Sequence, residues 1–300
     1  MTPLDLRNAE SVCETLERAA ELLHGSPLRS GCVHRLPAAG RLVVAGDLHD
    51  NPAHLQKITA FARLGESPTN HLVLQELIHG DRLVNGVDLS YRVVTRVADL
   101  VNRYPEQVHP LLANHELCQM LGIGVSKGYG DGTALFNDGL DFVFGEDGAV
   151  VAQSLASFFL AMPLAVRSAS GLWCSHSIPS PETTDRFDAT VFDRELAPSD
   201  YQAPRGSAYL MVWGRGQRAE QVDRLADAWG VRLFCLGHAM SESGAHAVTP
   251  RMAVINSDHE RGRVAEIDLA AIPGDAEELV LQTLPIVMLG DDGSSGWDRA

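Results

Sequence analysis

Five short, mostly apolar runs in this chain are each followed closely by residues that can bind a metal ion. Such runs are typical of strands buried within a β-sheet. When buried strands are parallel, their carboxyl ends lie at one edge of the sheet, so the residues that follow them come together. The pattern therefore predicts a buried sheet with a polar site at one edge. The runs are Arg41–Ala45, His71–Gln75, Val108–Ala113, Leu172–Ser175 and Val231–Leu236, and the residues after them are Asp47 with His49, Glu76, Asn114, His176 and His238.

Segments with helical periodicity separate most of these runs. Apolar residues recur three or four positions apart in each segment, and the first segment has Pro near its start and Gly25 at its end. Strands that alternate with helices form sheets with helical crossovers. We therefore expect an α/β fold, with an N-terminal helix within residues 1–25. The predicted helices run from about Pro3 to His24, Pro52 to Leu64, Tyr91 to Tyr104, Val151 to Met162 and Gln217 to Trp229.

The remaining segments have weaker signals. Two pairs of strands separated by turn residues are predicted to be hairpins, and one further pair is predicted to lie side by side. No repeat or linker interrupts the chain, so we expect one domain over residues 1–289 and a disordered tail over residues 290–300. The hairpins are Cys32–Leu36 with Arg41–Ala45 and Met252–Ile255 with Val264–Ile267, the side-by-side pair is Leu164–Val166 with Leu172–Ser175, the last strand is Leu279–Met288, and residues 122–148 and 177–207 are active-site or cap loops.

The charge of the chain limits the partners that it can bind. It has 39 acidic and 24 basic side chains, which give a formal net charge of −15. A surface of this sign repels the phosphate backbone of a long nucleic acid and the head groups of an anionic membrane. We therefore expect neither as a partner. A polyanionic substrate would need local positive charge, which metal cations in a cleft supply.

The cysteines and the apolar segments favour the cytoplasm. The five cysteines are scattered and form no Cys-x-x-Cys pair, so neither a disulfide framework nor a zinc knuckle is indicated. We expect them to be small core residues. No segment reaches the roughly 18 apolar residues that span a membrane, and no apolar run follows the N-terminus. The chain is therefore expected to be soluble and cytoplasmic.

The residues that follow the five runs have the chemistry of transition-metal ligands. Imidazole and carboxylate together suit Mn, Fe or Zn, and a carboxylate between two ions can bridge them. Two ions about 3.5–4 Å apart can activate a water molecule and stabilise the attacking and leaving oxygens during displacement at phosphorus. The set therefore predicts a site for two divalent ions, with Mn favoured over Fe or Zn.

The order and spacing of four motifs resemble the calcineurin-like metallophosphoesterase superfamily. The match extends over about residues 31–267, and the segment from Trp213 to Gly216 is similar to the phosphoprotein-phosphatase branch. The resemblance implies a four-layer α/β/β/α sandwich with two mixed sheets. The motifs are Gly46-Asp47-Leu48-His49-Asp50-Asn51, Ala113-Asn114-His115-Glu116, Ser175-His176 and Gly237-His238.

The resemblance also implies a role for each residue of the set. His115 would be the general acid that protonates the leaving oxygen, or would bind the phosphoryl group in the transition state. Arg215, in a glycine-rich turn, is the first choice for binding phosphate oxygens, with Arg218 and Arg82 behind it. The first ion would be held by Asp47 and His49, the second by Asn114, His176 and His238, and both by the bridging Glu76.

Three positions depart from the patterns of the superfamily. Gln75-Glu76 stands where the superfamily has Gly-Asp, so the bridging carboxylate reaches one methylene further. His79 begins the segment that replaces the Asp-Arg-Gly of the phosphoprotein-phosphatase branch, so it is a candidate partner of the catalytic histidine or a substitute for the arginine. Met240 stands where many members have a second histidine, which again resembles the phosphoprotein-phosphatase branch.

These features predict a metal-dependent phosphatase or phosphoesterase in which a metal hydroxide attacks a phosphate ester. The substrate would be a phosphoprotein, a nucleotide or a small phosphate ester. One alternative is a degenerate member of the fold that binds phosphorylated ligands or partners without turnover. A weaker alternative is a nuclease of the same superfamily, which the acidic charge and the lack of a basic stripe disfavour.

Overall fold

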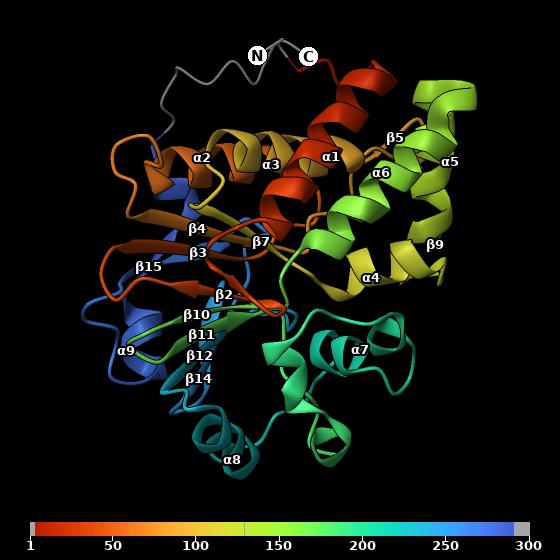
Figure 1. Cartoon of the computed structure of the whole chain (residues 1–300). Coiled ribbons are helices and arrows are strands. Elements are labelled where there is room, and N and C mark those ends of the chain that lie inside the picture. Colours follow the sequence, from red (N-terminus) through yellow and green to blue (C-terminus); the bar gives the residue numbers. More distant parts are fainter. Residues whose placement is uncertain (1–3, 129, 291–300) are drawn as a thin grey trace.

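Two mixed β-sheets pack face to face at the centre of the structure, a computed structural model that describes residues 4–128 and 130–290. One sheet has seven strands and the other has five. Helices cover the outer faces of both sheets, so that four layers follow one another from top to bottom in Figure 1. The predicted α/β/β/α sandwich is therefore confirmed.

The strands of each sheet come from distant parts of the chain. In the five-stranded sheet, the three strands that precede predicted ligands are parallel neighbours, and two more such strands are parallel neighbours in the seven-stranded sheet. The seven-stranded order is β1 (Arg29–Ser30), β2 (Val33–Leu36), β10 (Ala165–Ser168), β11 (Leu172–Ser175), β12 (Leu233–Leu236), β14 (Met252–Ile255) and β13 (Ala245–Thr249). The five-stranded order is β16 (Thr283–Pro285), β15 (Arg263–Asp268), β3 (Arg41–Asp47), β4 (Asn70–Gln75) and β7 (Val108–Leu111). Two short pairs are β5 (Leu83–Val84) with β6 (Val87–Asp88) and β8 (Ser126–Lys127) with β9 (Gly130–Asp131).

Alternate residues of the central strands pack into two different cores. On β11, Leu172 and Cys174 belong to the core between the two sheets. Trp173 between them belongs to the larger core on the other side of the strand, with helix residues such as Trp229. Side chains of successive strand residues point to opposite faces, so a strand covered on both faces is apolar throughout. This explains the uninterrupted apolar runs of the sequence.

The five predicted helices are confirmed, with small shifts at their ends. The first helix begins at Ala9 rather than near Pro3, because the side chain of Asn8 caps it by accepting a hydrogen bond of 2.8 Å from the N–H of Ser11. The α-helices are α1 (Ala9–His24), α2 (Pro52–Ala62), α3 (Tyr91–Arg103), α4 (Asn114–Leu121), α5 (Gly132–Phe144), α6 (Gly148–Ala161), α7 (Ser207–Val212), α8 (Ala219–Trp229) and α9 (Ala276–Leu281). The short 3-10 helices are η1 (Gly145–Asp147), η2 (Thr184–Arg186), η3 (Ala189–Asp193), η4 (Pro198–Tyr201) and η5 (Ile286–Met288).

The two predicted hairpins are wrong. β2 pairs with β1 and β10, whereas β3 pairs with β15 and β4 in the other sheet. In the same way, β14 pairs with β12 and β13, whereas β15 pairs with β3 and β16. Each connection therefore crosses from one sheet to the other. The predicted pairing of β10 with β11 is confirmed as antiparallel.

Two further predictions need correction, and both miss a capped helix. Residues 122–148 were expected to be a loop but contain α5, which Asp131 caps by accepting a hydrogen bond of 3.1 Å from the N–H of Thr133. The expected last strand over Leu279–Met288 is divided among the end of α9, β16 and η5. Residues 177–207 are irregular, as predicted, apart from three 3-10 helices and the start of α7.

Other expectations concern the cysteines, the membrane and the tail. All five cysteines lie in the described ranges, where they are buried and free, as expected for core residues. Within residues 4–128 and 130–290, no helix is long and apolar enough to cross a membrane. The predicted disordered tail lies outside the described residues, except for Gly290.

Candidate metal centre

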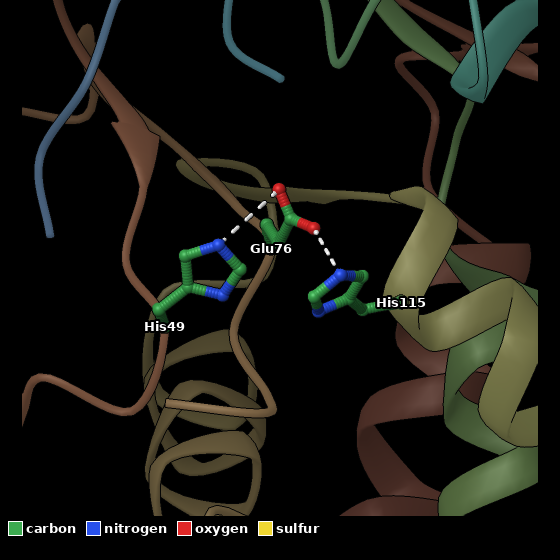
Figure 2. A group of neighbouring side chains, drawn as sticks. All are labelled: His49, Glu76 and His115. Carbon is green, nitrogen blue, oxygen red and sulfur yellow. Dashed lines mark ion pairs between the residues drawn. The ribbon is translucent and has the colours of Figure 1, made fainter. Parts of the chain in front are cut away.

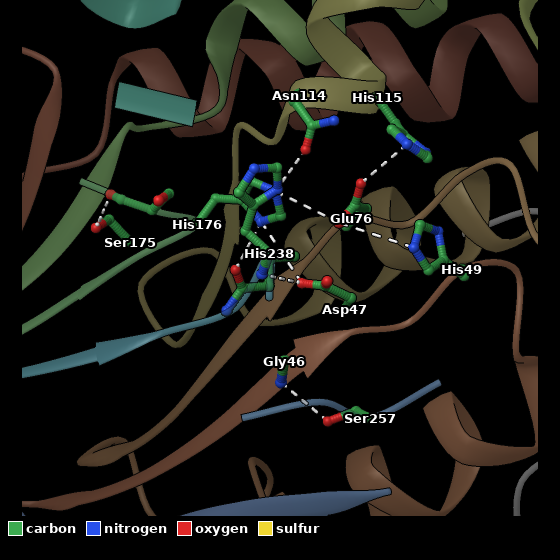
Figure 3. Close-up of polar contacts among 12 residues, drawn as sticks. Gly46, Asp47, His49, Glu76, Asn114, His115, Ser175, His176, His238 and Ser257 are labelled. Carbon is green, nitrogen blue, oxygen red and sulfur yellow. Dashed lines mark hydrogen bonds and ion pairs between the residues drawn. The ribbon is translucent and has the colours of Figure 1, made fainter. Parts of the chain in front are cut away.

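The carboxyl ends of five strands, three from one sheet and two from the other, bring the predicted ligands together. Figure 3 shows these side chains converging from both sheets on one small region. The convergence follows from the parallel direction of neighbouring strands within each sheet. Asp47 ends β3, with His49 two residues later, Glu76 follows β4, Asn114 begins α4 shortly after β7, His176 follows β11 and His238 follows β12.

The two sheets are joined directly at this edge. The N–H of Gly46 donates to Ser257 Oγ at 2.9 Å (Figure 3). The N–H of Ser257 donates to the carbonyl of Asp47 at 3.1 Å. A Cβ atom on Gly46 would overlap the carbonyl of Ile255, so only glycine permits this approach. The end of β3 is thereby fixed against the segment that follows β14.

Glu76 lies at the centre of the predicted ligands. Figure 2 shows its carboxylate between two imidazoles, with Oε2 3.9 Å from His49 Nε2 and Oε1 3.3 Å from His115 Nε2. The Oε2 atom also lies 3.4 Å from His176 Nε2. One carboxylate therefore faces histidines on both sides, as a bridging ligand must.

A second set of contacts surrounds His176, which is fully buried. Its Nε2 atom lies 2.7 Å from Asn114 Oδ1 and 3.0 Å from His238 Nδ1. Its Nδ1 atom lies 3.6 Å from Asp47 Oδ1. Two groups of side chains hold ligand-type atoms within 4.8 Å of one another, namely His49 with Glu76 and His115, and Glu76 with His176 and His238. The two groups share Glu76, a position that suits a bridging carboxylate, and the first group includes His115, which the sequence predicts to be catalytic rather than a ligand.

Several backbone torsions around this centre are unusual. Among the described residues, seven other than glycine have a positive φ, and three of them are predicted ligands: His49 at 42°, Glu76 at 46° and His238 at 64°. A positive φ is uncommon for residues with a Cβ atom, and such torsions cluster at functional sites. The folded chain therefore holds these side chains in place against local preference.

Burial controls the charge of the central side chains. It lowers the pKa of His238 to about 3, with Arg215 as the next cause, and it lowers the pKa of His176 well below the usual value. Both imidazoles are therefore neutral near pH 7, which is the form that binds metals. Burial also raises the pKa of Asp47 to about 6. A nearby cation would offset the cost of the charged carboxylate.

The two arginines predicted to bind phosphate have different surroundings. Arg215 is exposed, and its Nη2 atom lies 3.4 Å from His238 Nδ1. Arg218 contacts an acidic side chain instead, with Nη2 3.7 Å from Glu182 Oε1, and 75% of its side chain is exposed. The structure thus brings Arg215 to the candidate centre and does not bring Arg218 there, and the role of both residues stays a prediction.

Two polar pairs near the centre were not predicted as pairs. The buried side chains of His79 and Asp88 lie 2.9 Å apart, from Nδ1 to Oδ2, and the His79 ring lies 5.4 Å from that of His115, centroid to centroid. Gln75 Oε1 lies 3.0 Å from His176 Nδ1. The sequence marked His79 and Gln75 as departures from a family pattern. Their partners are nine and about a hundred positions away, where no local pattern can identify them.

Comparisons with known proteins identify the family and the fold. A search of curated proteins with the sequence returned no match. Similar solved structures include a protein serine/threonine phosphatase from Saccharomyces cerevisiae, at 16% identity and a TM-score of 0.63, with 87% of this chain and 82% of that chain covered. They also include a cold-active protein-tyrosine phosphatase from Shewanella sp., at 11% identity and a TM-score of 0.55, with 89% and 84% covered. The family model for calcineurin-like phosphoesterases matches residues 40–241. The chain therefore belongs to the calcineurin-like phosphoesterase family.

Proposed function

We propose that the chain hydrolyses a phosphate ester with the help of two divalent metal ions. The observation that carries the proposal is the position of Glu76, whose carboxylate is shared by two groups of ligand-type side chains. Membership of the phosphoesterase family supports the same conclusion. We expect Glu76 to bridge the ions, with His49 and Asp47 on one side and the remaining ligands on the other.

Bound divalent ions would supply the positive charge that stabilises phosphoryl oxygens and activates water. The protein supplies the geometry, because the ligands stand on strand ends fixed to one another across the two sheets. It also supplies neutral imidazoles, since burial lowers the pKa values of His176 and His238. Imidazole and carboxylate ligands suit Mn, Fe or Zn, and manganese is our first choice among these ions.

His115 is proposed as the residue that protonates the leaving oxygen. Its Nε2 atom lies 3.3 Å from Glu76 Oε1, so the ring faces the shared carboxylate. The ring of His79, which pairs with Asp88, lies 5.4 Å from the ring of His115, centroid to centroid. A histidine in this place can donate a proton to the departing alkoxide.

The substrate is proposed to be a phosphorylated small molecule, nucleotide or protein. Arg215 is proposed to bind phosphate oxygens at the rim of the centre, because its guanidinium lies 3.4 Å from His238. We place the enzyme in the cytoplasm, since five buried, unpaired thiols are usual in a reducing compartment.

The proposal is tested with metal-stripped protein that is refilled with Mn²⁺. We expect hydrolysis of p-nitrophenyl phosphate or of its bis ester, and loss of that hydrolysis in His238→Ala. In His115→Asn, bound metal is expected to remain while the turnover number falls by about 10²- to 10⁴-fold, as for loss of a general acid.

Two other results of this assay have clear meanings. Metal binding without hydrolysis of any phosphate ester tested would favour a protein that binds phosphorylated ligands without turnover. An activity that survives both metal removal and His238→Ala would rule out the proposed metal chemistry.

A further inference from the structure

Gln75 is the last residue of β4 and lies fully buried against the candidate metal centre. Its Nε2 atom donates to the backbone carbonyl of Ala45 at 3.0 Å. Its Oε1 atom lies 3.0 Å from Nδ1 of His176. A buried glutamine thus connects the backbone of the neighbouring strand β3 to an imidazole of the centre.

The partner of the amide nitrogen fixes the orientation of the glutamine. A backbone carbonyl accepts hydrogen bonds but cannot donate them, so the amide NH₂ must face Ala45 and the amide oxygen must face His176. An amide oxygen in turn can only accept, so Nδ1 of His176 must carry the hydrogen. A neutral imidazole has one N–H group. The Nε2 atom of His176 therefore keeps its lone pair.

That lone pair faces the other ligand-type atoms. Nε2 of His176 lies 2.7 Å from Asn114 Oδ1, 3.0 Å from His238 Nδ1 and 3.4 Å from Glu76 Oε2. The two oxygens offer lone pairs, so neither supplies a hydrogen to His176. A cation that accepts electron pairs from His176 Nε2 and from both oxygens satisfies this arrangement.

We propose that Gln75 is a positioning residue that fixes the tautomer of His176 and thereby directs Nε2 toward a bound metal ion. The inference rests on the proposed function and adds a residue that the ligand set does not contain. Partners that orient a metal-binding histidine in this way are usually carboxylates, backbone carbonyls or water molecules. Here a side-chain amide takes the place of these partners.

The structure also shows why an amide suits this position better than a carboxylate. Asp47 Oδ1 lies 3.6 Å from His176 Nδ1, further than Gln75 Oε1, so Gln75 and not Asp47 is the hydrogen-bond partner of Nδ1. A Cβ atom on Gly237 would lie 2.5 Å from Gln75 Oε1, so the glutamine fits because residue 237 is glycine. Glutamate at position 75 would also place a carboxylate oxygen against the carbonyl of Ala45.

Two substitutions separate hydrogen bonding from space filling. Gln75→Met keeps the length of the side chain but removes both hydrogen bonds. Gln75→Glu keeps an acceptor for His176 and loses the donor to Ala45. If Gln75 fixes the tautomer, Gln75→Met changes the tautomer of His176 and Gln75→Glu leaves it unchanged. If Gln75 only fills space, both Met and Glu, which have nearly the same length as glutamine, leave the tautomer of His176 unchanged.

The tautomer of His176 can be measured without metal or substrate. Nitrogen-15 NMR of metal-free protein near pH 8 distinguishes an Nδ1–H from an Nε2–H imidazole, with His176→Gln used to assign the signals. We expect Nδ1–H in the wild type and in Gln75→Met a mixture with a substantial Nε2–H fraction. Calorimetric titration with Mn²⁺ is expected to show a loss of affinity of about 10- to 100-fold in Gln75→Met, as for other outer partners of metal ligands.

Gln107→Met is the matched control. Gln107 directly precedes β7, and its Nε2 atom donates to the carbonyls of Leu64, Ser67 and Asn70 at 2.9, 2.8 and 2.7 Å. This substitution also removes amide hydrogen bonds to backbone carbonyls. Gln107, however, lies next to the start of β4, whereas Gln75 is the last residue of that strand. Its melting temperature is expected to fall, while the His176 tautomer and the Mn²⁺ affinity stay at wild-type values.

The outcomes distinguish this inference from the proposed function. The role of Gln75 is refuted if Gln75→Met leaves the His176 tautomer unchanged, or if the wild type already carries the hydrogen on Nε2. Wild-type protein that shows the expected tautomers but hydrolyses no phosphate ester would leave the role of Gln75 intact and contradict the proposed function.

Discussion

The carboxylate of Asp47 accepts a hydrogen bond of 2.8 Å from the backbone N–H of His238. Asp47 ends a strand of the five-stranded sheet, and His238 follows a strand of the seven-stranded sheet, so this bond joins ligand-bearing segments of both sheets. The same carboxylate is buried, which raises its pKa to about 6. Its charged form is therefore costly unless a cation is bound.

Replacing Asp47 with asparagine separates the hydrogen bond of this side chain from its negative charge. Asp47→Asn keeps an oxygen for the N–H of His238 but removes the charge. A carboxyl group with a raised pKa stabilises the fold at low pH, and that contribution is lost as the pH rises through about 6. As the pH rises from 4 to 8, the free energy of unfolding of metal-free Asp47→Asn is therefore expected to increase relative to that of the wild type, by up to roughly 3 kcal/mol.

Urea unfolding of the metal-free proteins at both pH values measures this difference. Calorimetry should show in addition that Asp47→Asn loses more Mn²⁺ affinity than the roughly 10- to 100-fold typical of an outer partner. Wild-type Mn²⁺ affinity in Asp47→Asn would mean that Asp47 is not a ligand.

Arg215 and Arg218 are predicted to differ in their effect on activity. Arg215 lies 3.4 Å from His238, whereas Arg218 lies 3.7 Å from Glu182 and is largely exposed. Loss of a hydrogen bond to a charged phosphate oxygen costs about 1.5–3 kcal/mol, so Arg215→Ala should lower kcat/KM by about 10- to 100-fold. Arg218→Ala removes only an exposed ion pair, which contributes little. Steady-state kinetics that rank the two variants in the opposite order would assign phosphate binding to Arg218.

Gly237 is predicted to tolerate no side chain. A Cβ atom at this position would overlap Asp47 Oδ1 and lie 2.5 Å from Gln75 Oε1. Gly237→Ala should therefore lower both the melting temperature and the Mn²⁺ affinity. Gly65→Ala is the control, because its Cβ atom would lie 3.5 Å from the hydroxyl of Tyr104, an ordinary contact. Equal Mn²⁺ affinities in the two variants would show that the site can move to accommodate the methyl group.

Three buried histidines form a chain of contacts between the two sheets. His34 Nδ1 lies 3.0 Å from His109 Nδ1, and His109 Nε2 lies 3.1 Å from His71 Nδ1. Burial lowers the pKa of His109 well below the usual value, with the neighbouring histidines as further causes. The unfolded chain therefore binds a proton that the folded chain excludes. This contribution to stability is present above the unfolded pKa of about 6.5 and is lost as the pH falls below it.

His109→Gln is predicted to weaken this dependence on pH. Glutamine keeps a donor and an acceptor but does not titrate. Urea unfolding of metal-free protein should show that the wild type loses about 2 kcal/mol more than the variant between pH 7.5 and pH 5. Parallel stability curves for the two proteins would mean that His109 takes up a proton in the folded state.

The candidate ligands could be predicted from the sequence because their signal is local. Each one follows a short apolar run, and the runs end at the same edge because neighbouring strands are parallel. The pairing of strands could not be predicted in the same way. Leu36 and Arg41 are separated by a turn, but Leu36 pairs with Ser168, more than a hundred positions away, and Arg41 pairs with Asn70, about thirty positions away.

The helix α5 was missed because its glycines have a role in packing. A Cβ atom on Gly139 would overlap the carbonyl of Asp88, so glycine allows the helix to approach β6 closely. In the sequence the same glycine is typical of a loop. The pair of His79 and Asp88 joins the segment after β4 to β6, a contact that no local pattern indicates.

The most direct test is a calorimetric titration of metal-stripped wild-type and Glu76→Gln protein with Mn²⁺, with folding monitored by circular dichroism. If Glu76 bridges two ions, the wild type binds about two per chain, and the single substitution weakens both binding events while the fold remains intact. A wild type that binds no ion, or a Glu76→Gln variant that loses one ion and binds the other with unchanged affinity, would contradict a centre built around a shared carboxylate.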